Sequence, residues 1–394
     1  MERYRGNLVL HRAVNDNRMI RPVVLIDELP WNEMNVDGSL TPVCEDAALR
    51  DAEVFFRRAL YRHRHFPADM IVQPHVTVRK IIRSSGIGLK QDEHVLATDA
   101  ENHIVSHGYS DLLSEESSLE NLHPPVITYD REETLRRWQI LGDAVGDLLP
   151  VKLAGVDYLY TSPWDVISTY RGVEPLLLDL AGRPEYSHRM VSLFTDFECE
   201  RLRRYEALGL LNPEPALLHC TCAAVSDLPG SAAEYDGGEV TRRGIWGRGM
   251  AQIFASASAA MRREFDIEYM KRTIGTCGLA YYGCCEPLDR CIDVVAEIPN
   301  LRKISVTPWA DVRVAAEAIA GRYVVALKPN PAAVAVPRLD RAQLRVEIET
   351  MLDACRDNRC SCDIVLKDIS TCHYRPENIF EWEQTVMELV RAHG

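Results

Sequence analysis

Long apolar runs are absent from this sequence of 394 residues. Residues 1–10 hold no uninterrupted apolar stretch, and no later segment approaches the ~20 apolar residues that span a bilayer. We therefore expect a cytoplasmic protein without a membrane partner. Basic residues are in the minority, because 45 lysines and arginines stand against 58 acidic residues, a net charge of -13. With no local basic patch, this balance disfavours binding to nucleic acid.

The sequence also has no glycine-rich phosphate loop, internal repeat or low-complexity tract. Its composition, 46% hydrophobic and 26% charged, is that of a globular chain with a sizeable core, which excludes disorder, collagen and coiled coil. Cysteine is plentiful at 12 residues, but a large core in a reducing compartment does not need a disulfide framework. Ten of the cysteines fall between Cys220 and Cys372, so we expect the chemistry in the second half.

Helical spacing over residues 45–66 predicts a helical N-terminal extension, residues 1–66, before a catalytic domain of residues 67–394. Short runs rich in β-branched and aromatic residues then alternate with helical segments, which predicts an α/β fold, a (β/α)8 TIM barrel. The alternative is an open, doubly wound sheet. The eight expected strands are residues 70–78, 125–129, 151–157, 216–222, 278–284, 301–307, 322–328 and 362–369.

Cysteine and histidine cluster where three of these strands end. His219 and Cys220 close the fourth expected strand, Cys284 and Cys285 the fifth, and Cys372 follows the eighth. In a barrel, strand ends of this kind meet at one mouth. Thiolate and imidazole are zinc ligands, so Cys284, Cys285 and Cys372 are candidate metal ligands. Side chains alternate along an extended strand, so only one of the adjacent pair is expected to face the mouth.

These cysteines have a plainer interpretation as small buried hydrophobic residues, which we favour for Cys220 and Cys222. His219 is open to three roles, as a metal ligand, a general acid or a hydrogen-bonded core residue. Glu286 could ligate metal or accept a proton, but we favour capping of a helix that begins at Pro287. Lys328 could orient an anionic substrate or a corrin side chain, or be a solvated rim residue.

Trp164 and Asp165 follow the third expected strand. They could line the pocket, and the alternative is a helix N-terminus with Asp165 in its first turn.

Four runs at residues 278–289, 301–309, 328–331 and 367–370 together resemble the uroporphyrinogen decarboxylase superfamily, and within it the corrinoid-dependent methyltransferase branch. The resemblance covers about residue 70 to the C-terminus. It implies a TIM barrel with zinc held by a His-x-Cys motif at one strand end and a distant cysteine near the C-terminus.

Tyr282-Gly283-Cys284 occupies the place of His-x-Cys, so Cys284 matches the cysteine and Tyr282 replaces the histidine. A shift by one residue makes Cys285 the match, and Cys372 lies near the last cysteine of the family. His219, Glu286 and His373 are the candidates to replace the missing histidine.

The resemblance implies a zinc-dependent methyltransferase that moves a methyl group between a small methylated compound and the cobalt of a corrinoid (cobalamin) protein. The corrinoid protein is the expected partner, and a homodimer is one expectation for the assembly. The expected catalytic residues are His219, Glu286 and Lys328. The residues expected to bind substrate are Trp164, Asp165, Tyr282, Trp309 and Asn330.

Two other functions remain open. One is a metal-free decarboxylase of a carboxylated substrate, but the arginine-rich motif that would clamp a porphyrinogen is absent, and residues 30–34 read Pro-Trp-Asn-Glu-Met in its place. The other is a non-catalytic binder of metal or corrinoid, which would have a closed four-ligand site.

Overall fold

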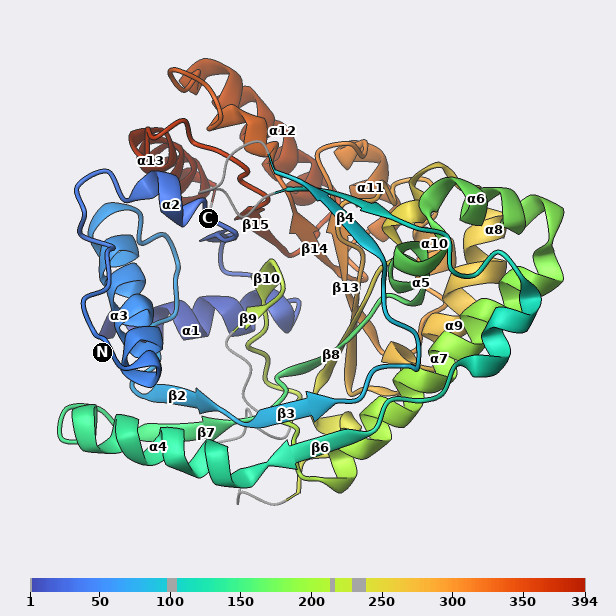
Figure 1. Ribbon diagram of the computed structural model, residues 1–394. Helices are drawn as coiled ribbons and strands as arrows, with labels where there is room; N and C mark the ends of the chain where they lie inside the picture. Colours follow the sequence, from blue (N-terminus) through green and yellow to red (C-terminus); the bar gives the residue numbers. More distant parts are fainter. Residues whose placement is uncertain (1, 98–104, 213–216, 229–238, 394) are drawn as a thin grey trace.

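A curled parallel sheet forms the centre of the computed structural model, which describes residues 2–97, 105–212, 217–228 and 239–393 (Figure 1). The sheet has seven strands in the order β1-β15-β14-β13-β12-β11-β8, and every neighbouring pair is parallel. These strands are β1 (Val23–Ile26), β8 (Tyr158–Thr161), β11 (Trp246–Gly249), β12 (Leu279–Tyr282), β13 (Leu301–Val306), β14 (Val324–Leu327) and β15 (Cys362–Leu366).

The architecture is TIM-like, but the barrel is not closed, so the prediction of a closed (β/α)8 barrel is corrected. In the described part of the chain, β1 and β8 are the two edges of the sheet and do not pair with each other. The fourth expected strand is instead an antiparallel hairpin, β9 (Leu217–Leu218) and β10 (Thr221–Cys222), which Figure 1 shows inside the curl. Residue 216, its expected start, lies outside the described residues.

The other early strand predictions fall in small separate sheets. β2 (Val76–Arg79) pairs with β7 (Val151–Ala154), β3 (Ile81–Ser84) with β6 (Ile127–Asp130), and β4 (Glu93–Leu96) with β5 (Ser106–Tyr109). In the main sheet, β1, β8 and β11 occupy the positions that were expected for the first four strands. β11 reads Trp-Gly-Arg-Gly and has no β-branched residue, so it has no recognisable strand pattern. β1 reads Val-Val-Leu-Ile, but it lies in the segment interpreted as a helical extension and was therefore not predicted as a strand.

Helices cover the outer face of the curl. α10 (Ile292–Val295), α11 (Val312–Ile319), α12 (Arg341–Asp357) and α13 (Glu377–Ala392) each follow a strand of the sheet. The other helices are α1 (Glu2–Asn15), α2 (Trp31–Met34), α3 (Ala47–His65), α4 (Arg131–Val145), α5 (Pro163–Arg171), α6 (Val173–Gly182), α7 (Pro184–Ala207), α8 (Ala259–Arg262) and α9 (Glu268–Met270).

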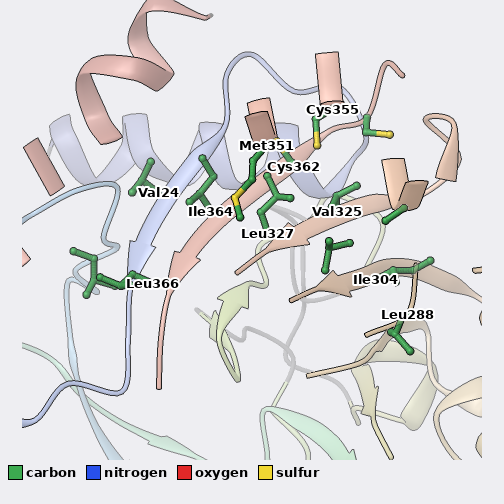
Figure 2. Close-up of a cluster of buried hydrophobic side chains, with 14 of the residues drawn as sticks. Val24, Leu288, Ile304, Val325, Leu327, Met351, Cys355, Cys362, Ile364 and Leu366 are labelled. Carbon is green, nitrogen blue, oxygen red and sulfur yellow. The ribbon is translucent and has the colours of Figure 1, made fainter. Parts of the chain in front are cut away.

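The main core lies between the sheet and these helices because side chains alternate along each strand. Ile304, Val325, Leu327 and Ile364 point outward and are fully buried with Met351 of α12 (Figure 2). Residues of the opposite parity face into the curl. Both faces of the sheet are therefore buried, as parallel sheets require.

No helix in the described ranges has both the length and the apolar character needed to cross a membrane.

Burial of His11 on α1 makes stability depend on pH. The ring is fully buried, its Nε2 lies 2.8 Å from the Asp69 carbonyl oxygen, and its Nδ1 has no hydrogen-bond partner among the described residues. Burial lowers the pKa of His11 to about 4. In the unfolded chain His11 binds a proton near pH 6.5, whereas in the folded chain it binds one only near pH 4. The folded state therefore loses stability as the pH falls from about 6.5 towards 4.

We expect His11 to cost roughly 2 kcal/mol of unfolding free energy between pH 7 and pH 5. Urea denaturation at the two pH values measures this loss, and H11Q, which cannot titrate, should show a smaller one. Equal losses in the two proteins would contradict the assignment.

Candidate functional site

The polar groups of the candidate site follow the carboxyl ends of parallel strands. Glu28 comes two residues after β1, Lys367 and Asp368 directly follow β15, and Cys284 follows β12 after one glycine. Because the carboxyl ends of parallel strands lie on one edge of a sheet, these side chains meet there. His219 and Cys220 join them from the turn of the β9–β10 hairpin.

Three of these residues offer metal ligands to one point. The ligand atoms of Glu28, His219 and Cys220 lie within 4.8 Å of one another, and in the described ranges no other set of three His, Cys, Asp or Glu residues does so. His219 Nε2 is 3.3 Å from Glu28 Oε1, and the same ring is hydrogen-bonded to the Cys284 thiol. Oxygen, nitrogen and sulfur donors therefore converge at this edge.

Cys284 and Cys285 lie side by side, with their Sγ atoms 3.6 Å apart. The expected alternation does not hold because β12 ends at Tyr282 and Gly283 turns the chain with φ +102°. A side chain at position 283 would be strained at this φ, and its Cβ would lie 2.7 Å from Leu288 Cδ1. Glycine here is what lets both thiols approach the same place.

The surroundings of Cys284 favour its thiolate. The hydrogen bond from Cys285 lowers the pKa of Cys284 well below its ordinary value, and it outweighs the burial that would raise it. The His219 hydrogen bond and the charges of Arg248 and Lys367 act in the same direction. Lys367 Nζ lies 3.6 Å from Cys284 Sγ. The hydrogen bond with Cys284, then burial and the charge of Cys284, raise the pKa of Cys285.

Arg248 supplies a second positive charge from the inner face of β11. Its side chain is fully buried, and none of its guanidinium nitrogens has a hydrogen-bond partner among the described residues. The guanidinium lies 4.8 Å from the centroid of the Tyr160 ring. A buried cation without a carboxylate is costly, and the charge that compensates it here is that of the Cys284 thiolate.

A pair of carboxylates completes the site. Lys367 Nζ lies 2.5 Å from Asp368 Oδ2 and 3.7 Å from Glu28 Oε2. Burial, and then a hydrogen bond with Asp368, raise the pKa of Glu28. Burial acts on Asp368 in the same sense, but the Glu28 hydrogen bond and the Lys367 charge lower its pKa to about 2. Of the two carboxyl groups, Glu28 is therefore the one that binds a proton more readily.

The backbone at the site is strained. Glu28, Cys220 and Asp368 have positive φ values of 49°, 57° and 56°, a region that residues with a side chain rarely adopt. Each costs on the order of 1–3 kcal/mol and persists only where the surrounding structure enforces it. Three such residues from three segments meet at one place, as is typical of functional sites.

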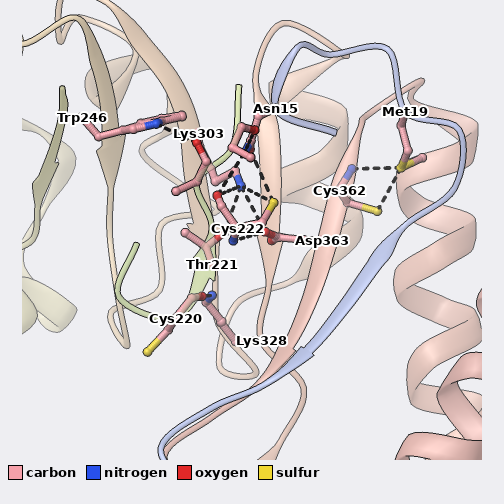
Figure 3. A network of polar contacts seen from close by, with 12 residues as sticks. Asn15, Met19, Cys220, Thr221, Cys222, Trp246, Lys303, Lys328, Cys362 and Asp363 are labelled. Carbon is pink, nitrogen blue, oxygen red and sulfur yellow. Dashed lines mark hydrogen bonds and ion pairs between the residues drawn. The ribbon is translucent and has the colours of Figure 1, made fainter. Parts of the chain in front are cut away.

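A buried polar network holds the hairpin in the curl (Figure 3). Lys303 Nζ of β13 lies 3.0 Å from Asp363 Oδ2 of β15 and donates to Thr221 Oγ1 at 2.9 Å and to the Cys222 carbonyl oxygen at 3.0 Å. The Cys222 N–H donates to Asp363 Oδ2 at 3.0 Å, and Thr221 donates to the same oxygen. These contacts fix the turn that presents His219.

Two of the expected catalytic residues, Lys328 and Glu286, form hydrogen bonds with backbone groups of this site. Lys328 is buried and donates to the Cys220 carbonyl oxygen, so it supports the hairpin. Glu286 is buried and accepts from the Cys284 N–H at 3.0 Å and the Ala251 N–H at 3.2 Å. The helix expected from Pro287 begins only at Ile292, so the capping role is wrong.

The residues expected to bind substrate make other contacts. Trp164 is buried and its indole donates to the Phe265 carbonyl oxygen at 2.7 Å. Tyr282 is buried between Arg262 and Asp266. Asn330 caps the short 3-10 helix Pro331–Ala333, and Trp309 is 70% exposed after β13.

Asp165 lies in the first turn of α5 and accepts from the Gln252 N–H at 2.9 Å. Burial, and then the charge of Glu286, raise its pKa to about 7. Cys372 is fully buried, and its N–H donates to Glu33 at 2.7 Å. Its thiol does not form a set of three donors within 4.8 Å with Cys284 and Cys285 in the described residues.

Glu28, Arg248 and Asp368 are the site residues that the sequence analysis did not single out. Glu28 comes two residues after the short apolar run of β1, and an acidic residue just after a buried strand was the available signal. Asp368 belongs to the 367–370 run, but it had no role assigned.

Neither the family models nor the curated proteins searched give a match to this chain. Among solved structures, a methyltransferase from Methanosarcina mazei is similar to it, with a TM-score of 0.51 and 13% sequence identity over 98% of this chain and 97% of that chain. At this identity the likeness shows the fold. Fold and site together define an α/β protein of TIM-like architecture with a cluster of carboxylate, imidazole and thiol side chains at the carboxyl edge of its sheet.

Removal of the Asp363 carboxylate should loosen the hairpin. D363N leaves Lys303 charged and buried without its counter-ion, so we expect a loss of about 3–5 kcal/mol in unfolding free energy. Urea denaturation measures the loss, and hydrogen exchange of Thr221 and Cys222 reports the hairpin.

The double variant K303M/D363L removes both charges and should recover most of this stability. E381Q, which breaks the exposed pair of Arg341 and Glu381, should cost less than about 1 kcal/mol. If D363N were as stable as E381Q, the network would not hold the hairpin.

Proposed function

We propose that this protein is a zinc-dependent methyltransferase that moves a methyl group between a small methylated compound and the cobalt of a partner corrinoid protein. The convergence of Glu28, His219 and Cys220, whose ligand atoms lie within 4.8 Å of one another at the carboxyl edge of a TIM-like sheet, is the observation that carries the proposal. The shared fold of a methyltransferase from Methanosarcina mazei supports it.

The chemistry of the donors fits zinc. Zinc takes thiolate, imidazole and carboxylate ligands, and a catalytic site uses three protein ligands and keeps one position open. Glu28, His219 and Cys220 would hold the ion, and Cys284, which is hydrogen-bonded to His219, borders the same position. Zinc bound there supplies a Lewis acid for the atom that loses or accepts the methyl group.

Charged residues around the proposed zinc site would stabilise an anionic reacting group. Lys367 and Arg248 put positive charge beside Cys284, which stabilises negative charge on sulfur. The pKa of Glu28 is raised in the metal-free chain, so a metal ion would compete with a proton for this carboxyl group. Lys328 and the Lys303–Asp363 pair keep His219 in place through the hairpin backbone.

The corrected donor set differs from the one that the resemblance implies. Glu28, His219 and Cys220 take the places of the family histidine and its two cysteines. Cys284 borders the set through its hydrogen bond with His219, Cys285 is the neighbour of Cys284, and Cys372 is a buried residue outside the set.

Metal content tests the proposal directly. Protein purified without chelators under reducing conditions should carry about one zinc per chain by elemental analysis. C220S and H219A should each lose most of the metal because each removes a ligand, and E28Q should lower it. C372S is the matched control and should keep the metal. C284S shows whether the bordering thiol is a further ligand.

Activity is measured with methylcobalamin as methyl donor and a small thiol as acceptor, followed by the absorbance of the corrinoid. C220S and H219A should lose most of the rate and C372S should retain it. A wild-type chain that takes up no zinc after reconstitution would sink the proposal, and a metal-free decarboxylase would be tested next.

A further inference from the structure

Cys284 and Cys285 form a pair of adjacent thiols at a strand end, and only Cys284 borders the proposed zinc site. Their sulfur atoms are 3.6 Å apart, so a modest change of side-chain rotamer brings them into bonding distance. Cys284 is buried, whereas Cys285 is partly exposed at the edge of the site. A small polar reagent can therefore reach the pair without unfolding of the chain.

The surroundings of the pair favour reaction at sulfur. Lys367 Nζ lies 3.6 Å from Cys284 Sγ and 3.5 Å from Cys285 Sγ. Cys285 Sγ lies 3.3 Å from Asp368 Oδ2, so a proton acceptor stands beside the second thiol. A cation beside one sulfur, and a second thiol within reach to resolve the product, are the features of cysteines that react with peroxide.

We propose that Cys284 and Cys285 are a modification site for hydrogen peroxide, at which they close a reversible disulfide bond. The Cys284 sulfur attacks one peroxide oxygen, the O–O bond breaks, and the departing hydroxide takes up a proton to leave as water. The Cys285 sulfur then attacks the sulfenic sulfur of Cys284, the S–O bond breaks, and a second water leaves. Two thiols lose two electrons and two protons, and one peroxide becomes two waters.

The disulfide is expected to reverse easily. The Cα atoms of adjacent residues are about 3.8 Å apart, shorter than the roughly 4.4–6.8 Å of ordinary disulfides, so the bond would be strained. Strained and exposed disulfides are the readily reduced ones. A small thiol such as dithiothreitol would restore both cysteines and would itself be oxidised to a disulfide.

The consequence for metal binding rests on the proposed function. If Cys284 is a further zinc ligand, the disulfide removes its thiolate and the metal is released, and bound zinc in turn protects the pair from peroxide. The peroxide reaction itself does not depend on zinc.

The test treats the full chain, both as purified and after removal of metal by a chelator, with hydrogen peroxide. Intact mass should fall by two hydrogens, peptide mass spectrometry should place the bond between Cys284 and Cys285, and dithiothreitol should reverse it. C285A lacks the resolving thiol, so Cys284 should accumulate as a sulfenic acid that dimedone traps. C284A should form neither product.

C291A is the matched control, because Cys291 is a buried thiol near the same loop, and it should behave like the unmodified chain. A chain that forms no bond between residues 284 and 285, or a C285A variant that traps no sulfenic acid, would overturn the inference. A disulfide that forms without loss of zinc would leave the modification site standing and would exclude Cys284 as a zinc ligand.

Discussion

The ion pair between Lys303 and Asp363 is the interaction on which the rest of the site depends. In the described part of the chain, the seven-stranded sheet does not close, because its edge strands β1 and β8 do not pair with each other. The β9–β10 hairpin occupies part of the interior of the curl. The hairpin has only two residues in each strand, too few to be stable alone. A buried lysine and a buried aspartate tie it to β13 and β15, and a buried pair is satisfied only when further hydrogen bonds use its remaining protons and lone pairs.

The buried positive charges inside the curl of the sheet are compensated in different ways. Lys303 is neutralised by a carboxylate, whereas Arg248 and Lys367 face the Cys284 thiol. These two cations stabilise negative charge on the Cys284 sulfur. The strained backbone at Glu28, Cys220 and Asp368 brings further donor groups to the same edge of the sheet. Both faces of the sheet are buried, and this core stabilises the fold enough to tolerate the strained backbone at the site.

Much of the α/β pattern could be predicted from the sequence. The strands β12 to β15 and the helices α4, α7, α11 and α12 lie where alternation and spacing place them, because each combines a clear period with regular length. β11 could not be predicted, since Trp246-Gly247-Arg248-Gly249 has no strand pattern and is held by its neighbours. β1 has a clear pattern but lies outside the expected barrel, and Glu28 was missed with it.

The sequence by itself determined which chemistry is available, since it places cysteine, histidine, lysine and carboxylate residues directly after buried strands. His219, Cys284 and Cys285 were recognised in this way because the end of a parallel strand is a local feature. Tertiary structure alone decided which of them meet. Glu28 and His219 are far apart in the chain, and Cys372 turns into the core. Their distances depend on how the sheet curls and where the hairpin docks, and these follow from contacts between distant segments that no local pattern records.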